Sequence, residues 1–240
     1  MTTQHPALPA IELPQLRRDG IGAHAARQLD VLIRPFPGME AGDLIEVFWD
    51  KRFVSALILE PRHVAHDLRI RVPEGFIHSG MARLRYQVLR AGEQRLHSPV
   101  TLVMVKLERP GGVCRSAVKG ENTHLAPLRF PAAIRRFGVN LGAHRSGVPF
   151  TVPTYPNMAA GDEITLRWGD ERHDLPRVRP DQVGQPLVGL LPYALLRRAG
   201  NDSSMAISWC VIDRVGNSSQ WAPLQHLRVW GARTEPLFAF

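Results

Sequence analysis

The sequence predicts an all-β protein made of two tandem β-sandwich domains that are joined by a linker containing proline and glycine. Three observations lead to this prediction: an internal repeat, a period of two in the apolar residues, and turn-forming residues between short apolar segments. The chain has 240 residues, of which 44% are hydrophobic and 22% charged, a composition typical of globular domains. This length is sufficient for two domains that each bury a core.

An internal repeat covers most of the chain. Residues 37–49 read PGMEAGDLIEVFW and residues 156–168 read PNMAAGDEITLRW, so that seven of thirteen positions are identical at an offset of 119. The same offset aligns Val72-Pro73 with Leu191-Pro192 without an insertion. Self-similarity at a fixed offset indicates that one structural unit is present twice.

The repeat also predicts the domain boundaries. Tyr86-Gln87-Val88 matches Trp209-Cys210-Val211 at an offset of 123, which places a short insertion near Asn201. The residues between the copies are rich in proline, glycine, serine and asparagine, which favour a linker over a packed core. We expect a first domain at 1–108, a linker at 109–124, a second domain at 125–230 and a C-terminal tail at 231–240.

The alternation of apolar and polar residues predicts antiparallel strands that are buried on one face. Ile45, Val47 and Trp49 occupy every second position of residues 43–49, and the second copy repeats the pattern up to Trp168. A period of two places such residues on the same face of a strand. The same pattern predicts further strands at 68–72, 84–88, 102–107 and 206–211.

Each copy has the features of a β-sandwich of the immunoglobulin type. Six to eight short strands fit into about 100 residues, and a tryptophan lies on an early strand that faces inward. The disulfide that joins the two sheets in many such domains has no counterpart, because the chain contains two cysteines in all. We expect Trp49 and Trp168 to pack in the two cores rather than to stack on a ligand.

The segments that flank these strands have local explanations. Gly42-Asp43 and Gly161-Asp162 fit turns in which glycine supplies a positive φ and aspartate accepts hydrogen bonds from nearby amides. A calcium site is not expected there, because neighbouring oxygen ligands are missing. Pro73 and Pro192 are expected to end strand pairing before short turns or helical pieces at 74–79 and 193–198.

Charge and hydropathy exclude several functional classes. The net charge of +8 results from 30 basic and 22 acidic residues, but the basic residues are scattered along the chain. This pattern favours solvated faces over a specific nucleic-acid site, and leaves acidic glycans or anionic surfaces open as partners. No apolar run is long enough to span a membrane. The N-terminus lacks the features of a secretory signal, so we expect either a cytoplasmic location or export by a leaderless route.

The sequence contains no recognisable catalytic or cofactor-binding motif. Gly-x-Ser-x-Gly, phosphate-binding and dinucleotide-binding patterns are all missing, and no cofactor is expected. The most metal-like group is His63, His66 and Asp67, with His78 and His97 elsewhere in the first copy. The second copy has Gln182, Gln185 and Pro186 in place of the first three residues. We therefore favour a structural or exposed histidine pair over a metal site.

The two cysteines are expected to differ in environment. Cys210 follows Trp209 in a predicted strand, which predicts a buried thiol. Cys114 lies in the predicted linker beside Arg115, where an exposed thiol can react or crosslink two chains, although an inert thiol is favoured.

The motif shared by the two copies resembles that of bacterial immunoglobulin-like repeat domains. The pattern Pro-x-Met-x-x-Gly-Asp-x-Ile-x-x-x-Trp is carried in the second copy by Met158, Gly161, Asp162, Ile164 and Trp168. Such tandem units occur in long repetitive proteins of pseudomonads and related proteobacteria. The resemblance covers both copies and implies a sandwich fold with a surface, adhesive or assembly role. It implies no catalytic site.

Two functions follow from these expectations. The first is a non-enzymatic tandem binding module that engages a protein or a glycan at the bacterial cell surface or in an assembly. The alternative is an intracellular adaptor, accessory or immunity-type protein for a secretion or toxin system. Carbohydrate binding would require exposed aromatic residues on one sheet face, and Phe48 and Trp221 are the candidates. The sequence leaves open whether the protein is a monomer or a homodimer.

The region that differs most between the copies is the expected location of binding specificity. Residues 50–64 and 169–183 share almost nothing, although the residues on either side align. Binding residues concentrate on variable segments that a rigid scaffold presents. The candidate partner-binding residues in these segments are Lys51, Arg52, Phe53, Glu171, Arg172 and His173.

Overall fold

A computed structural model describes residues 7–16, 18–114 and 118–231 of the chain. The chain divides into two compact units, of which the first comprises residues 1–108 with 215–217 and the second comprises 109–214 with 218–240. The C-terminal tail expected at 231–240 lies outside the described residues, apart from Gly231.

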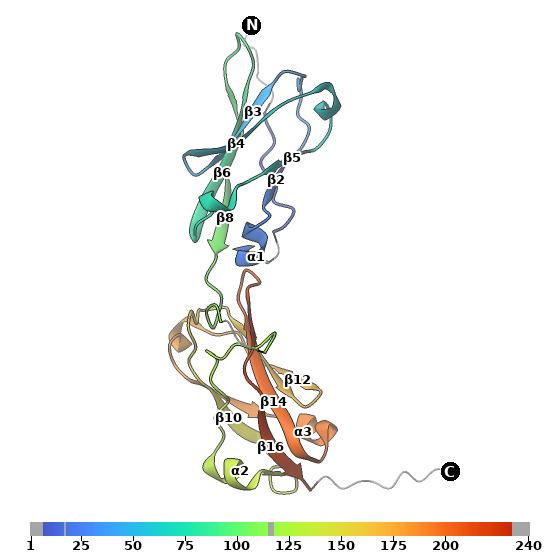
Figure 1. Ribbon diagram of the computed structural model, residues 1–240, viewed down its shortest axis with the longest axis vertical. Helices are drawn as coiled ribbons and strands as arrows, with labels where there is room; N and C mark the ends of the chain where they lie inside the picture. The colour runs from blue at the N-terminus through green and yellow to red at the C-terminus, as the bar shows by residue number, and fades with distance from the viewer. Residues whose placement is uncertain (1–6, 17, 115–117, 232–240) are drawn as a thin grey trace, which may run out of the picture. The chain divides into compact units, whose positions relative to one another are not determined.

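The first unit is a β-sandwich of one larger and one smaller sheet (Figure 1). The larger sheet has the strand order β1-β8-β6-β3-β4, with β7 added beside β6, and the smaller sheet consists of β2 and β5. Strand β1 is parallel to β8, and the other pairs are antiparallel. The elements are β1 (Gly20–Gly22), α1 (Ala23–Ala26), β2 (Asp30–Ile33), β3 (Leu44–Trp49), β4 (Arg52–Ile58), η1 (Pro61–His63), β5 (Leu68–Arg71), η2 (Glu74–Phe76), β6 (Gly80–Leu89), β7 (Leu96–His97) and β8 (Thr101–Lys106).

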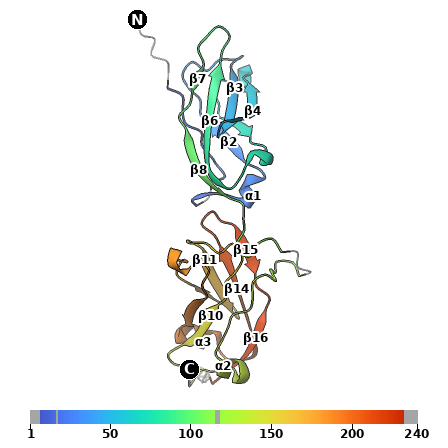
Figure 2. The same ribbon diagram turned by 90° about the vertical axis from the view of Figure 1, so that its left-hand side faces the viewer.

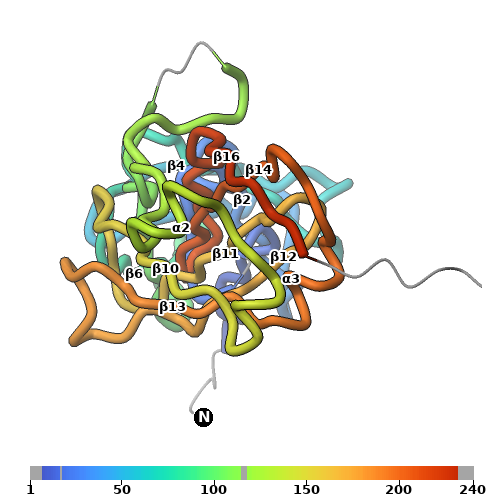
Figure 3. Tube along the Cα trace, turned by 90° about the horizontal axis from the view of Figure 1, so that it is seen from below, coloured from blue at the N-terminus to red at the C-terminus, as the bar shows by residue number. Residues whose placement is uncertain are grey.

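The second unit repeats this architecture (Figure 2). Figure 3 shows its Cα trace from below. Its larger sheet has the order β12-β11-β14-β16-β9, with β15 beside β14, and its smaller sheet consists of β10 and β13. Strand β9 is parallel to β16, as β1 is to β8. The elements are α2 (Ala132–Phe137), β9 (Val139–Asn140), β10 (Val148–Val152), β11 (Glu163–Trp168), β12 (Glu171–Asp174), η3 (Pro180–Gln182), β13 (Leu187–Leu191), α3 (Tyr193–Ala199), β14 (Asp202–Ile212), β15 (Ser218–Trp221) and β16 (Gln225–Trp230).

The prediction of two tandem immunoglobulin-like β-sandwiches is therefore confirmed. Strand register shows how closely the units correspond, because Trp49 pairs with Leu84 in the first and Trp168 pairs with Ile207 in the second. These pairs are related by the offsets of 119 and 123 found in the sequence. The expected strands and the helical pieces after Pro73 and Pro192 are also present, as β5, β6, β8, β14, η2 and α3.

Each unit has its own core between its two sheets. Both Trp49 and Trp168 are buried in these cores, as expected. In the first unit, Val31 of the smaller sheet belongs to the same cluster as Ile45 of the larger sheet. The alternation in β3 buries every second residue, because one face of the sheet packs on the core and the other faces outward.

The glycine–aspartate turns have the predicted geometry. Gly42 has φ 94° and Gly161 has φ 87°. Asp43 Oδ2 accepts a hydrogen bond from the Glu40 amide at 3.1 Å, and Asp162 Oδ2 accepts one from the Ala159 amide at 2.9 Å. Both aspartates are buried, so these bonds hold the turn that leads into β3 and β11.

Part of the segment expected to be a linker is packed into the second unit. Gly111 and Asn122 are buried, and Asn122 Nδ2 donates hydrogen bonds to the Gly111 carbonyl at 3.2 Å and the Ser219 carbonyl at 2.9 Å. The composition of the segment did not indicate this packing. The segment is held by a polar side chain that hydrogen-bonds to backbone groups, and not by the burial of apolar residues.

Candidate functional site

The outer face of the first unit's larger sheet carries apolar side chains together with charged ones, among them Glu46, Arg83 and Arg85. Alternation along β3 turns Leu44 and Phe48 outward, and Phe53 of β4 is the register partner of Phe48. We call this surface the apolar sheet face and define it by Leu44, Phe48, Phe53, Ile58, Met81 and Leu102.

Four side chains of this face are more than half exposed: Phe53 (52%), Ile58 (64%), Met81 (59%) and Leu102 (58%). Single exposed apolar residues are normal on protein surfaces, but apolar side chains on neighbouring strands of one face form a patch. Phe48 and Phe53 contact each other edge to face, with ring centroids 6.2 Å apart. On β6, Arg85 pairs with Phe48 and Arg83 pairs with Leu102, so two arginines lie between this aromatic pair and the apolar side chain of β8.

The second unit carries polar residues at the corresponding positions. Phe48 pairs with Arg85 and Phe53, whereas its counterpart Arg167 pairs with Ser208 and Arg172. The counterpart of Leu102, which pairs with Arg83, is His226, which pairs with Ala206. At the positions of Phe48, Phe53 and Leu102 the first unit therefore has apolar side chains where the second unit has arginine or histidine.

A hollow of about 620 Å³ opens at the end of the apolar sheet face, where β3 turns into β4. We call it the basic hollow. Its lining residues are Trp49, Asp50, Lys51, Arg52, Phe76, His78, Arg83, Arg85 and Val100.

Positive charge dominates this hollow. Lys51, Arg52 and Arg83 make no ion pair among the described residues. The one acidic residue of the lining, Asp50, accepts a hydrogen bond from the Arg83 amide at 2.9 Å. The guanidinium of Arg85 lies 4.7 Å from the centroid of the Phe48 ring, which joins the hollow to the apolar sheet face.

The residues predicted for partner binding lie at equivalent places in the two units. Lys51 and Arg52 line the basic hollow, and Phe53 lies on the apolar sheet face. Glu171, Arg172 and His173 occupy the corresponding strand β12.

Two of the three residues on β12 are engaged within their own unit. Arg198 Nη2 lies 2.7 Å from Glu171 Oε2, and Arg172 Nε lies 2.8 Å from Asp174 Oδ1. The hydrogen bond from Arg172 lowers the pKa of the Asp174 carboxyl. The charges of Glu171 and Arg172 on β12 are therefore partly neutralised within the second unit. In the hairpin of the first unit, Lys51 and Arg52 have no acidic partner among the described residues, so their charges are more available to a ligand.

Sequence reasoning missed His78, Arg83 and Arg85 as members of this site. They follow Arg52 by more than twenty residues, and only strand pairing brings β6 beside the β3–β4 hairpin. The spacing of Arg83 and Arg85 at alternate positions of a strand was a usable signal, because it places both side chains on the outer face.

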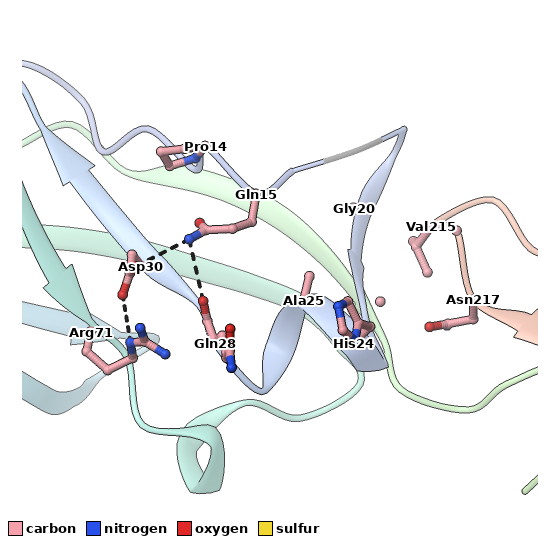
Figure 4. Close-up of a pocket in the computed structure, with 12 residues that line it drawn as sticks. Pro14, Gln15, Gly20, His24, Ala25, Gln28, Asp30, Arg71, Val215 and Asn217 are labelled. Carbon is pink, nitrogen blue, oxygen red and sulfur yellow. Dashed lines mark hydrogen bonds and ion pairs between the residues drawn. The ribbon is translucent and has the colours of Figure 1, made fainter.

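A second hollow of the first unit contains polar side chains that are held by one another (Figure 4). Gln15 Nε2 lies 3.4 Å from the Gln28 carbonyl oxygen and 3.4 Å from Asp30 Oδ2. Arg71 Nε lies 2.7 Å from Asp30 Oδ1, and the two residues are register partners in β2 and β5. These contacts tie the smaller sheet together and give the side chains a structural role.

His63 and His66 of the first unit also have local partners. His63 Nδ1 accepts a hydrogen bond from the Glu60 amide at 3.0 Å, and His66 Nδ1 donates to the Val64 carbonyl at 2.8 Å. Asp67 Oδ2 is 2.8 Å from Arg34 Nη1. Within residues 7–16, 18–114 and 118–231, no three His, Cys, Asp or Glu side chains are arranged to hold a metal ion.

The two thiols differ in environment. Cys210 is buried, as predicted, and burial raises its pKa to about 11. Cys114 is half-buried, and its Sγ lies 3.1 Å from Thr123 Oγ1. This hydrogen bond lowers the pKa of the Cys114 thiol.

The two aromatic residues considered for carbohydrate binding belong to different units. An arginine lies over each ring: Arg85 is 4.7 Å from the centroid of Phe48, and Arg167 is 5.9 Å from that of Trp221. Sugar stacking needs an open ring face, and these arginines occupy one face of each ring.

No helix among the described residues has the length and apolarity needed to cross a membrane. No protein-family model matches the chain, and no curated protein sequence matches it.

Several solved structures are similar to the chain at low sequence identity. The fibronectin(III)-like modules of Clostridium thermocellum CbhA align with 96% of this chain and 99% of their own, at 12% identity and a TM-score of 0.48. A structure from a 1.5-MDa bacterial ice-binding adhesin aligns with 93% of this chain at 12% identity and a TM-score of 0.38. The FN1–FN3 domains of chicken CNTN1 align with 93% at 9% identity and a TM-score of 0.41. The chain spans 65% of the length of each of the latter two structures.

Proposed function

We propose that this chain is a non-enzymatic binding module whose apolar sheet face binds another protein. The observation that carries the proposal is the contrast between the units, in which Phe48, Phe53 and Leu102 stand where the second unit has arginine or histidine. The polar residues of the second unit show that the sandwich does not need apolar side chains at these positions. Large exposed apolar side chains that gather on one outer surface are typical of a protein interaction site.

The chemistry of the surface indicates what kind of partner fits. Phe48 and Phe53 form an aromatic pair at the β3–β4 hairpin, and the cations Lys51, Arg52 and Arg85 lie beside them. A protein with an apolar contact region bordered by acidic residues complements both features. The resemblance of the repeated Gly-Asp motif to bacterial immunoglobulin-like repeats supports a role at the cell surface or in an assembly.

The test uses the second unit as a guide to substitution. Phe53→Arg introduces the residue that the second unit carries at the equivalent position, Arg172, so the sandwich is expected to tolerate it. The full-length protein is used to capture partners from lysate and envelope fractions of the source cell at two salt concentrations. The captured protein is then purified, and its affinity for wild type and variants is measured by titration calorimetry.

We expect binding that survives high salt, because apolar contacts are screened less than surface charges. Phe53→Arg is expected to weaken it by about tenfold, whereas Arg172→Ala in the second unit changes it by less than about twofold. Thermal unfolding confirms that each variant is folded. Unchanged affinity in a folded Phe53→Arg variant would contradict the proposal.

A further inference from the structure

Strand β4 forms an open edge of the first unit's larger sheet. It is the last strand in the sheet order, and among the described residues it pairs only with β3. Its seven residues, Arg52–Ile58, include one charged side chain and no proline. Soluble proteins usually protect such edges with charges, proline or very short strands, because the free amides and carbonyls can pair with another chain.

The second unit shows this protection at the same place. Its edge strand β12 has four residues, Glu171, Arg172, His173 and Asp174, all of which carry ionisable side chains. Three of them, Glu171, Arg172 and Asp174, form ion pairs at its surface. One architecture thus has a protected edge in the second unit and an unprotected edge in the first.

The direction of the free backbone groups follows from the hydrogen bond that ends the β3–β4 ladder. The Leu59 amide donates to the Asp43 carbonyl at 2.8 Å, so this amide points toward β3. Amides alternate in direction along an antiparallel strand, so those of Leu57 and Ser55 also point toward β3. The amides of Ala56 and Ile58 therefore point to the open edge.

The basic hollow lies at the start of this edge. Lys51 immediately precedes β4 and Arg52 is its first residue. Arg83 adds a third cation, which makes no ion pair among the described residues. Trp49 and Phe76 contribute apolar lining, which strengthens electrostatic attraction by excluding water. Charge complementarity therefore favours a carboxylate in the hollow.

We infer that the partner contributes an extended peptide segment that pairs with the open edge of β4 and places an acidic side chain in the basic hollow. Main-chain hydrogen bonds to the Ala56 and Ile58 amides provide part of the affinity in this mode of recognition, and the side chains provide specificity. The inference rests on the proposed function, which it extends by specifying the conformation and charge of the bound segment.

The test uses defined peptides and the full-length protein. The probe is a fluorescein-labelled peptide of about nine residues that alternates valine and threonine and carries two glutamates at one end. One control peptide has lysines in place of the glutamates, and another has prolines in place of alternate valines. A second acidic peptide carries the glutamates at the opposite end, which distinguishes the two strand directions. Binding is measured by fluorescence anisotropy.

We expect at least one of the acidic peptides to bind at least about tenfold more tightly than the lysine and proline peptides. The double variant Lys51→Glu/Arg52→Glu is expected to remove the preference for glutamate. Ala56→Pro removes an amide that points to the open edge and is expected to weaken binding at least about fivefold. Hydrogen exchange at Ala56 and Ile58 should slow when the peptide binds.

The matched control is Asp174→Pro in the second unit. Asp174 pairs with Thr165 as Ala56 pairs with Glu46, so this substitution removes the equivalent edge amide of β12. It is expected to leave peptide binding unchanged. Near-ultraviolet circular dichroism verifies that the Ala56→Pro variant is folded. Even if that variant does not fold, hydrogen exchange in the wild type decides the question: unchanged exchange at the Ala56 and Ile58 amides when the peptide is added would overturn the inference.

Other outcomes assign the edge to a different occupant and overturn the inference. If sedimentation experiments show that the wild type is a dimer and that the Ala56→Pro variant is a monomer, the edge is assigned to a second copy of the chain. A heparin oligosaccharide provides the test for an acidic glycan. If it binds tightly, if Lys51→Glu/Arg52→Glu abolishes this binding and Ala56→Pro does not, and if the protein does not discriminate among the peptides, the hollow is assigned to an acidic glycan. If the protein partner loses affinity with Phe53→Arg but not with Ala56→Pro, the proposed function holds and strand pairing does not.

Discussion

His63 and Gln182 perform the same structural role in the two units with different chemical groups. The Nδ1 atom of His63 accepts a hydrogen bond from the Glu60 amide, and the Oε1 atom of Gln182 accepts one from the Arg179 amide, each at 3.0 Å. Each bond closes the short helical turn that begins at Pro61 or Pro180. This equivalence explains why a histidine in one copy aligns with a glutamine in the other.

We predict that His63→Gln preserves stability, because glutamine can supply the same acceptor. His63→Ala should lower the free energy of unfolding by about 0.5–1 kcal/mol, the usual contribution of one partly exposed cap. Urea unfolding followed by tryptophan fluorescence checks both variants. Equal losses of stability in the two variants would show that the acceptor atom is not what matters at this position.

The buried carboxylate of Asp43 should make the free energy of unfolding depend on pH in the acidic range. Burial acts to raise the pKa of Asp43, but hydrogen bonds from Arg90 and the Glu40 amide, together with the charge of Arg90, outweigh it and hold this pKa below its usual value. The resulting stability is fully present above the unfolded-state pKa of about 3.9 and is lost as the pH falls through the lower folded-state value.

Asp43→Asn should therefore cost about 1–3 kcal/mol at pH 7 and flatten the decline of stability below pH 4. Unfolding free energies of wild type and variant across pH 2–7 provide the measurement. Glu93→Gln, which alters a more exposed and longer contact of Arg90, is the control and should change little. Parallel curves for wild type and Asp43→Asn would contradict the assignment.

The two buried tyrosines should respond in opposite ways to loss of the hydroxyl group. The Tyr155 hydroxyl donates a hydrogen bond to Asp162 Oδ2 at 2.9 Å, whereas the buried Tyr86 hydroxyl has no hydrogen-bond partner among the described residues. Burial raises the pKa of both phenols. Tyr155→Phe should cost about 1–2 kcal/mol, and Tyr86→Phe should be neutral or stabilising by up to about 1 kcal/mol.

Thermal and urea unfolding of the two variants give the comparison, with the half-exposed Tyr193→Phe as the reference. A large loss of stability in Tyr86→Phe would indicate that a bound water satisfies its hydroxyl.

The two cysteines should react with a thiol reagent at very different rates. Cys114 is half-buried and the hydrogen bond with Thr123 lowers its pKa, whereas Cys210 is buried and burial raises its pKa to about 11. Since the thiolate is the reactive form, Cys114 should react first at pH 7 and Cys210 only on unfolding. Thr123→Val should slow the reaction of Cys114 with the reagent and leave the reaction rate of Cys210 unchanged. A disulfide-exchange assay followed by mass spectrometry identifies the modified residue.

The divergent segment can be exchanged between the units. Replacing residues 50–64 by the sequence of residues 169–183 preserves the hairpin, because Asp50 and Gly169 adopt the same positive φ, 56° and 59°. It removes Lys51, Arg52 and Phe53 together and supplies the shorter, charged edge. We expect partner binding to be lost while the exchanged protein still folds. Retained binding would place specificity outside this segment.

The sequence by itself determined the repeated unit and its strands. The offset of 119 between the Gly-Asp turns, the alternation in β3 and β11 and the buried Trp49 and Trp168 are local properties. A period of two specifies which residues face the core wherever one face is buried. A glycine before an aspartate specifies the turn from its own backbone freedom.

Tertiary structure alone decided which outward-facing residues become neighbours. Phe48 and Phe53 flank the same hairpin, but Arg83 joins Lys51 and Arg52, and Leu102 joins Met81, only through the register of β6 with β3 and β8. The packing of Asn122 against Gly111 and Ser219 likewise depends on contacts that are distant in sequence. Register across a sheet depends on pairing between distant segments, and alternation along one strand does not contain that information.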